Sequence, residues 1–349
     1  MSESVDLREG AVRRLVDAGR RLHDRGATLA AALSESTGLS PEGVLFALGR
    51  SLEWDATRDD VTSFVEAAPP TSEVTVVLSA NVFTASLRAI AWARAKAPRV
   101  TVRASRREPL FTELLLAECA DPAITLVQDV VFETLRAGEV HVYGRDATLA
   151  AIRAQLSSDV TFVGHGSGMG VALVTKPEAM LVDAAKALAD DVVLFDQRGC
   201  LSPRVVFVRR GFEGPFAEAF HRALDVRSTD VPRGRIEESE FASAIVWRQT
   251  MAAVGSVYEG TSHAIGVVDT VRPAIVPPPG RNVLVVPYDT LADVPGHLGP
   301  LRDLVVAVGG DHVQAVRDVF GTSVRASSLG QMQRPRLDGP VDVRGRVLR

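Results

Sequence analysis

The sequence of 349 residues has few cysteines, few lysines and no long apolar run. Its two cysteines, Cys119 and Cys200, are too few for a disulfide framework, and no Cys-x-x-Cys pair suggests a zinc site. No apolar stretch approaches the roughly 20 residues that a membrane-spanning helix needs. The first residues carry charges where a signal peptide would have an apolar core. These absences argue against a secreted or membrane protein, and we expect a cytoplasmic one.

A surplus of charge of one sign is also missing. The 39 basic and 43 acidic residues give a formal net charge of −4 at pH 7, so neither nucleic acid nor an anionic membrane surface is expected as a partner. Only Lys96, Lys176 and Lys186 are lysines. Apolar residues, by contrast, make up 46% of the chain. At this length they are expected to form more than one core.

Short β-branched runs alternate with helical segments along most of the chain. Residues 74–78, 99–103 and 139–143 are expected to be strands, and segments of helical spacing lie between them. A second series of strands and helices begins near residue 159. Such alternation is typical of parallel sheets that bind ligands at the carboxyl ends of their strands. The sequence therefore predicts an α/β fold with two doubly wound domains.

Cys200 lies on a polar turn between two apolar runs, Val192–Phe195 and Val205–Val208, and we expect both runs to be strands. Turns on rigid scaffolds often present reactive groups, and a thiol at such a place can hold an acyl group as a thioester. Most lone cysteines, however, are small buried hydrophobes. The local sequence leaves both interpretations open.

The glycine-rich segment 164–170 invites comparison with a dinucleotide-binding loop. No G-x-G-x-x-G can be placed on it, and strand-like residues follow where that motif needs a helix. Its four glycines instead allow the backbone to pass close to a flat ring or another chain segment. His165 within it could be a hydrogen-bonding site residue, a general acid or a turn histidine, and local grounds favour the turn.

Polar residues follow two of the expected strands. Ser79 and Asn81 come directly after the first strand; an amide there can stabilise an oxyanion, although a helix cap is the plainer interpretation. Arg103, Ser105 and Arg106 follow the second. Guanidiniums at a strand end suit a phosphate, and a solvated charged run is an equally good interpretation.

Taken together, these segments resemble the aldehyde dehydrogenase superfamily, and within it the acyl-CoA reductase branch of LuxC-like fatty-acid reductases. The most specific block is Asp-Gln-x-x-Cys-x-Ser-Pro around Cys200. The blocks occur in the family's order between about residues 40 and 340, and they are Leu78–Phe83, Val102–Arg106, Val142–Asp146, Phe162–Gly166, Phe195–Pro203 and Ser327–Met332.

The resemblance implies roles for single residues. Cys200 is the nucleophile that forms the acyl-enzyme, and Asn81 donates to the oxyanion together with the backbone N–H of Cys200. Arg103 replaces a lysine that contacts the adenosine ribose. Arg106 stands near a position that is often acidic in enzymes preferring NAD, so NADP(H) is favoured over NAD(H).

The remaining cofactor-binding residues follow from the same resemblance. Gly144 and Arg145 match the turn and helix start where the pyrophosphate lies. Ser79, Ser105 and Gly166 complete the expected set.

One departure from the family pattern bears on the reaction. Hydrolytic aldehyde dehydrogenases carry a glutamate in the glycine-containing turn upstream of the cysteine, whereas this chain has His165 there. Without that base, the thioester should survive to meet hydride or a thiol, and His165 could act as a general acid. The expected function is NADPH-dependent reduction of acyl-CoA to an aldehyde, with CoA as the leaving group. Aldehyde oxidation and a catalytically inactive scaffold subunit remain as alternatives.

The resemblance also implies the domain organisation. We expect a helical lead-in and NAD(P)-binding domain at residues 1–156, completed by about residues 312–349, and a catalytic domain at 157–311. A homo-oligomer is expected, and so is the possibility of a partner protein that delivers the acyl group.

Overall fold

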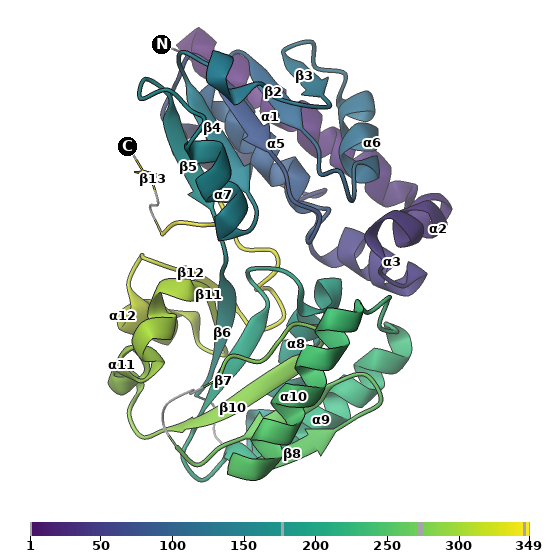
Figure 1. Cartoon of the computed structure of the whole chain (residues 1–349), viewed down its shortest axis with the longest axis vertical. Coiled ribbons are helices and arrows are strands. Elements are labelled where there is room, and N and C mark those ends of the chain that lie inside the picture. The colour runs from purple at the N-terminus through teal and green to yellow at the C-terminus, as the bar shows by residue number, and fades with distance from the viewer. Residues whose placement is uncertain (1, 176–177, 271–274, 345–346, 349) are drawn as a thin grey trace. The chain divides into compact units, whose positions relative to one another are not determined.

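The computed structural model describes residues 2–175, 178–270, 275–344 and 347–348. The chain divides into two compact units, each with its own sheet (Figure 1). Unit 1 comprises Met1–Thr37, Ser51–Ser167 and Arg336–Arg349, and unit 2 comprises Gly38–Arg50 and Gly168–Pro335. The predicted α/β class is confirmed.

The sheet of unit 1 has the strand order β3-β2-β1-β4-β5-β13. All neighbours are parallel except β13, which runs antiparallel to β5. From β1 the chain adds β2 and β3 on one side, and it then adds β4 and β5 on the other side. The boundary between β1 and β4 is therefore the switch point at which doubly wound sheets bind ligands. The strands are β1 (Val74–Val77), β2 (Val100–Arg103), β3 (Ile124–Val127), β4 (Glu139–Tyr143), β5 (Thr161–His165) and β13 (Val347–Leu348).

Helix α1 of unit 1 packs against α4, α5 and α6, while α7 packs on β5. Under α7, apolar side chains of alternate strand positions form one face of the sheet, among them Val140, Val142 and Phe162. The helices are α1 (Ser2–Asp24), α2 (Gly26–Thr37), α4 (Arg58–Glu66), α5 (Ala85–Lys96), α6 (Leu110–Cys119), α7 (Asp146–Arg153) and the 3₁₀ turn η1 (Phe132–Thr134).

The sheet of unit 2 has the order β12-β11-β6-β7-β10-β9-β8 and is parallel except for the β8–β9 pair. The central strands β6, β10 and β11 are buried along their whole length, as expected where helices cover both faces. The strands are β6 (Met169–Val174), β7 (Pro203–Arg209), β8 (Ser256–Glu259), β9 (Ala264–Val267), β10 (Asn282–Tyr288), β11 (Val305–Gly310) and β12 (Arg325–Ser328).

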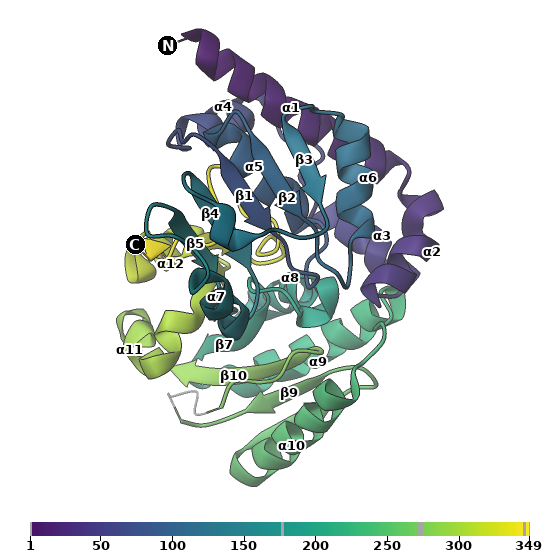
Figure 2. The ribbon, with the colours of Figure 1, turned by 45° about the horizontal axis from the view of Figure 1, so that its top comes forward.

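Helix α9 of unit 2 packs on α8 and on β9 and β10, and α10 packs on β8 and β9 (Figure 2). Trp247 and Met251 of α10 join the apolar core over the sheet. The helices are α3 (Pro41–Arg50), α8 (Leu181–Val193), α9 (Glu213–Asp230), α10 (Glu238–Val254), α11 (Val294–Leu298) and α12 (Val313–Phe320), with 3₁₀ turns η2 (Glu178–Met180), η3 (Leu194–Gln197), η4 (Leu291–Asp293) and η5 (Gly299–Leu304).

The run Val192–Phe195, expected to be a strand, is not one. Helix α8 continues through Val193, and the 3₁₀ turn η3 follows directly. The expectation was wrong because four apolar residues fit the buried end of a helix as well as a strand, and periodicity cannot separate the two over so short a run. The run Val205–Val208 lies in β7, as expected.

The boundaries of the two units differ from the expected domain boundaries. Residues 157–167 lie in unit 1 because β5 pairs with β4 there. Residues 312–335 lie in unit 2 because β12 pairs with β11, and only the chain from Arg336 onward belongs to unit 1. Residues 38–50 lie in unit 2, where Gly38 accepts a hydrogen bond from the Arg235 N–H at 2.6 Å.

No helix within the described ranges is both long enough and apolar enough to cross a membrane.

Candidate active site

The loop that carries Cys200 has an unusual backbone. Phe195, Asp196 and Gln197 have φ values of 54°, 50° and 64°, so three successive residues with side chains adopt the left-handed region. Each such residue costs of order 1 kcal/mol unless its surroundings impose the conformation. The loop therefore needs strong tertiary contacts on both sides.

Buried polar contacts supply that support. The carboxylate of Asp196 accepts from Nη2 of Arg281 at 2.7 Å, and both side chains are at most 2% exposed. Its second oxygen accepts from the backbone N–H of Gly234 at 3.0 Å. The Gln197 amide donates to the carbonyls of Pro203 and Asn282 at 2.8 and 2.7 Å, and its oxygen accepts from the Asn282 N–H at 2.8 Å. These groups are satisfied, as buried polar groups must be.

The segment after β12 closes on the same region. The Asp191 carboxylate accepts from the backbone N–H groups of Gly330 and Met332 at 2.6 and 2.9 Å, while burial raises the pKa of Asp191 to about 8. The Gln333 side chain donates to the Ser202 hydroxyl at 2.6 Å. The segment overlaps Ser327–Met332, the last block of the resemblance, and it contacts both α8 and the Cys200 loop.

Gly170 explains one part of the glycine-rich segment. A Cβ atom there would lie 2.2 Å from the carbonyl oxygen of Leu201, so only glycine allows this approach. The Gly170 N–H donates to the Ser202 carbonyl at 2.8 Å. The glycine thus lets β6 pass close to the backbone of the Cys200 loop.

Cys200 is half-buried and forms no disulfide, and Arg204 is a charged residue that interacts with it electrostatically. Burial lowers the pKa of Arg204, and the negative charge of Cys200 acts in the opposite direction. Its Nε is buried without a hydrogen-bond partner among the described residues. A buried guanidinium favours the thiolate, which is the reactive form of cysteine.

The other predicted site residues lie in unit 1, after the strands of its sheet. Ser79 and Asn81 follow β1 and are exposed. Arg103 ends β2, and Ser105 and Arg106 follow it. Because the carboxyl ends of parallel strands share one edge, the structure brings these residues to the edge where a nucleotide would bind.

The arginines after β2 differ in their surroundings. Arg106 pairs with Asp129 at 2.6 Å, and both side chains are more than 60% exposed, so the pair is weak. Arg103 is half-buried, and its Nε has no hydrogen-bond partner in the described part of the chain. An unsatisfied cation beside exposed guanidiniums fits the phosphate of a nucleotide cofactor.

The turn between β4 and α7 holds Gly144 and Arg145. The Gly144 N–H donates to the His165 carbonyl at 3.2 Å, and Arg145 is the exposed N-cap residue of α7. Asp146 in the first helical turn accepts from the Ser167 N–H at 3.0 Å, next to Gly166. These residues lie at the strand edge described above.

His165 ends a row of polar side chains on the face of the sheet opposite α7. Its Nε2 lies 3.3 Å from Nδ1 of His141, whose Nε2 lies 2.9 Å from the Glu139 carboxylate. Lys96 of α5 pairs with Glu139 at the far end. The ring of Tyr143 stacks on His165 with the centroids 4.1 Å apart.

The surroundings within this row shift the pKa values of Glu139 and His165. Burial raises the pKa of Glu139, but hydrogen bonds from His141 and Lys96 hold it below its ordinary value. Burial, and then the charge of His141, lowers the pKa of His165 to about 3. His165 is therefore a neutral imidazole at pH 7, able to donate or accept a hydrogen bond and poorly suited to act as a cationic acid.

The sequence matches the acyl-CoA reductase (LuxC) family over residues 47–334. The chain belongs to this family. It is an oxidoreductase of the group that interconverts acyl groups and aldehydes. No curated protein matches the chain.

Solved structures of dehydrogenases and of another oxidoreductase share the fold of this chain. Aldehyde dehydrogenase 21 from Physcomitrella patens has a TM-score of 0.68 at 14% identity, over 95% of this chain and 79% of that one. NADP-dependent glyceraldehyde-3-phosphate dehydrogenase from Bacillus halodurans, solved with NADP, has a TM-score of 0.66 at 13% identity, over 94% and 80%. An oxidoreductase from Marinobacter aquaeolei has a TM-score of 0.67 at 11% identity, over 97% and 83%.

Sequence reasoning missed the residues that support these sites. Arg204 and Arg281 carry no local signal, because an arginine beside an apolar strand is usually a solvated end residue. The polar row did have a signal: Glu139, His141 and Tyr143 alternate along β4 with Val140 and Val142. Polar residues at every second position of a buried strand indicate that one face of the strand makes polar contacts, here with Lys96 of α5.

Replacing Arg204 by Met should make Cys200 less reactive near neutral pH. Without the guanidinium, the thiolate is less stable, so the pH at which alkylation of Cys200 reaches half its maximal rate should rise. The measurement is iodoacetamide labelling across pH, followed by mass spectrometry of the peptide that contains Cys200. The matched control is Arg209→Met at the exposed end of the same strand; equal profiles for both variants would contradict the role of Arg204.

His165 should make stability depend on pH. Its pKa is about 3 in the folded protein and 6.5 in its ordinary state, so the unfolded chain binds more protons between these values. The contribution of the neutral His165 imidazole to the free energy of unfolding is complete above pH 6.5 and is lost as the pH falls towards 3. Urea unfolding should therefore show a smaller loss of stability between pH 6.5 and 4 for His165→Gln than for the wild type. A His165→Gln slope equal to that of the wild type would refute the assignment.

Proposed function

We propose that this protein reduces an acyl thioester, acyl-CoA, to the aldehyde with NADPH, through an acyl-enzyme on Cys200. The observation that carries the proposal is the Cys200 loop. Three left-handed residues held by buried polar contacts precede a thiol that has a guanidinium as its charged neighbour. A backbone this constrained is typical of a functional site, and it lies within the part that matches the LuxC acyl-CoA reductase family.

The proposed reaction begins at the sulfur of Cys200. The thiolate attacks the carbonyl carbon of the acyl thioester, the bond to the CoA sulfur breaks, and CoA leaves as a thiolate that takes up a proton. NADPH, when bound, supplies a hydride to the resulting enzyme thioester. The thiohemiacetal then breaks its carbon–sulfur bond, which releases the aldehyde and returns the Cys200 thiolate. The balance is one thioester, one hydride and one proton for one aldehyde and one CoA thiol.

Two residues of unit 1 are assigned to this carbonyl by the resemblance. Asn81 is proposed as the side-chain donor to the oxyanion, in keeping with its exposed place after β1. His165 stands where hydrolytic relatives carry a glutamate. Its neutral imidazole supports a hydrogen-bonding role, which we propose in place of the expected acid role.

The proposed cofactor is NADP(H) in preference to NAD(H). Arg103 and Arg106 would bind the 2′-phosphate, with Ser79 and Ser105 beside them at the strand edge. Gly144, Arg145 and Gly166 would hold the pyrophosphate, with Arg145 at the start of α7. The strand order of the sheet in unit 1 supports a dinucleotide at this edge.

The remaining parts of the proposal concern setting and partners. The two thiols outside any disulfide, Cys119 and Cys200, agree with the cytoplasm. By the resemblance we propose a homo-oligomer, and an acyl-transferring protein as an alternative donor to free acyl-CoA.

The acyl-enzyme can be trapped directly. Incubation with labelled acyl-CoA in the absence of cofactor should place one acyl group on Cys200, because His165 stands where hydrolytic relatives carry the glutamate that activates water. Mass spectrometry of peptides identifies the labelled residue, and NADPH added afterwards should release labelled aldehyde. Cys200→Ser should abolish both signals, while Cys119→Ser should leave them unchanged.

The trapping experiment also separates the alternatives. Aldehyde formation without acyl label on Cys200 would exclude an acyl-enzyme intermediate on that residue. Faster turnover of aldehyde and NADP⁺ than of acyl-CoA and NADPH would favour oxidation. A protein that takes neither label nor cofactor would be the inactive scaffold.

Replacing Arg106 by Ala should raise the KM for NADPH and leave that for NADH unchanged. A hydrogen bond to a charged group contributes about 1.5–3 kcal/mol, which corresponds to roughly a 10- to 100-fold change. Because Asp129 pairs with Arg106, Asp129→Asn should lower the KM for NADPH. Initial rates with both cofactors provide the measurement, with Arg107→Ala as the exposed control. An equal rise of the KM for NADPH and of the KM for NADH would show that Arg106 does not bind the 2′-phosphate.

A further inference from the structure

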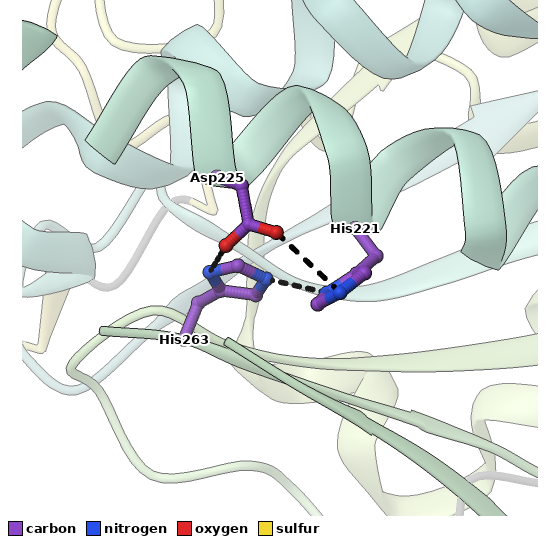
Figure 3. Close-up of side chains that lie close together, drawn as sticks. All are labelled: His221, Asp225 and His263. Atoms are coloured by element: carbon purple, nitrogen blue, oxygen red, sulfur yellow. Dashed lines mark hydrogen bonds and ion pairs between the residues drawn. The ribbon is translucent and has the colours of Figure 1, made fainter. Parts of the chain in front are cut away.

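Unit 2 contains two histidines and an aspartate that the proposed reaction does not use. His221 and Asp225 lie one turn apart on α9, so their side chains share a face of the helix. His263 directly precedes β9 and is fully buried. Figure 3 shows the three side chains pointing towards one another. They are the described residues whose ligand atoms gather within 4.8 Å of one another in a metal-binding combination.

The three side chains form a closed ring of contacts. Nδ1 of His221 lies 3.0 Å from Nε2 of His263. Nε2 of His221 lies 3.4 Å from Oδ2 of Asp225, and Nδ1 of His263 lies 3.9 Å from Oδ1 of Asp225 (Figure 3). Every nitrogen of the two imidazoles therefore faces another lone-pair-bearing atom.

One nitrogen of this cluster has no hydrogen bond. Nδ1 of His263 lies 3.9 Å from Oδ1 of Asp225, which is too far for a hydrogen bond. It is buried without a hydrogen-bond partner among the described residues, and a buried polar atom in this condition is costly. A cation bound between the three side chains would satisfy it.

We propose that this cluster is a binding site for a divalent transition-metal ion such as Zn²⁺, held by one nitrogen of each histidine and one oxygen of Asp225. A cation satisfies lone pairs that face one another, and neutral imidazole and carboxylate are ligands that zinc prefers. Tetrahedral zinc with bonds of about 2.0–2.1 Å places its ligand atoms roughly 3.3 Å apart. The two imidazoles already have nitrogens at 3.0 Å, and the half-exposed Asp225 side chain can turn inward. A water molecule would fill the fourth position.

The surroundings permit a cation despite two nearby arginines. Arg281 and Arg248 both act to lower the pKa of His263. The charge of Arg281 is compensated by its buried pair with Asp196, and Nη1 of Arg248 lies 3.8 Å from the Glu259 carboxylate. Asp225 therefore supplies the negative charge that the ion needs.

The neighbouring loop is shaped around the cluster. At Gly260 a Cβ atom would lie 2.2 Å from Cε1 of His263 and 2.8 Å from Oδ1 of Asp225, so a side chain there would displace both. The Gly260 N–H donates to the His263 carbonyl at 3.0 Å. Arg233 donates to the carbonyls of Ser262 and Gly280 at 3.0 and 3.3 Å. A metal ion would join α9 to this loop and so stabilise unit 2.

The test is zinc binding to the full chain after treatment with a chelator. Calorimetric titration should show one high-affinity Zn²⁺ per chain, and Tm should rise with Zn²⁺ concentration because the ion binds the folded state. Asp225→Asn should weaken binding by more than about tenfold, the loss that even an outer residue of a zinc site causes. His221→Gln and His263→Gln should do the same. Asp225 is half-exposed, so its variant remains folded even where a histidine variant does not.

Controls separate this site from the thiols. Glu218→Gln changes an exposed carboxylate of the same helix and should leave the affinity as in the wild type. Cys200→Ser should also retain the zinc, and the Co²⁺-substituted protein should show no thiolate charge-transfer band. The proposal is overturned if zinc fails to raise Tm, if Asp225→Asn binds it as the wild type does, or if binding is lost in Cys200→Ser.

Discussion

The buried ion pair between Asp196 and Arg281 is the interaction on which the arrangement of unit 2 depends. Two charges that are at most 2% exposed are costly to bury and are tolerated only when every polar atom has a partner. Asp196 meets this condition through Arg281, Gly234 and its own carbonyl, which accepts from the Gly280 N–H at 3.0 Å. The pair is what holds α8, the Cys200 loop and the start of β10 together. The left-handed backbone before Cys200 follows from this constraint, because no local preference of Phe195, Asp196 or Gln197 would produce it.

Unit 1 satisfies a different constraint. Its sheet carries a polar row, from Lys96 through Glu139 and His141 to His165, on a face that in most parallel sheets is apolar. Each member is paired with the next, so the row remains neutral overall although partly buried. The rigid stack of Tyr143 on His165 fixes the orientation of the last imidazole at the carboxyl end of β5. A residue held in this way has a defined hydrogen-bonding direction, which a histidine on a free turn lacks.

The sequence was informative where chemistry and local pattern coincide. The alternation of strands and helices predicted the fold class, and the block around Cys200 led to the family that the comparison confirmed. The run Val192–Phe195 was misread because four apolar residues fit the buried end of a helix as well as a strand. The turn that follows depends on contacts of Asp196 and Gln197 with Gly234, Arg281 and Asn282, which lie 38 to 85 positions further along the chain. The two units differ from the expected domain boundaries because β12 and residues 38–50 pair and pack with distant segments of the chain. The roles of side chains such as Arg204 and His263 depend on their neighbours in the folded chain, and the sequence does not reveal those neighbours.

In the proposed reaction, His165 stands where hydrolytic relatives carry the glutamate that activates water. A base that activates water must bind the proton that the water loses. Burial, and then the charge of His141, lowers the pKa of His165 to about 3, so this imidazole binds a proton less readily than an ordinary histidine. On the proposed route, a thioester beside so weak a base reacts slowly with water, and this is the condition under which hydride transfer can compete.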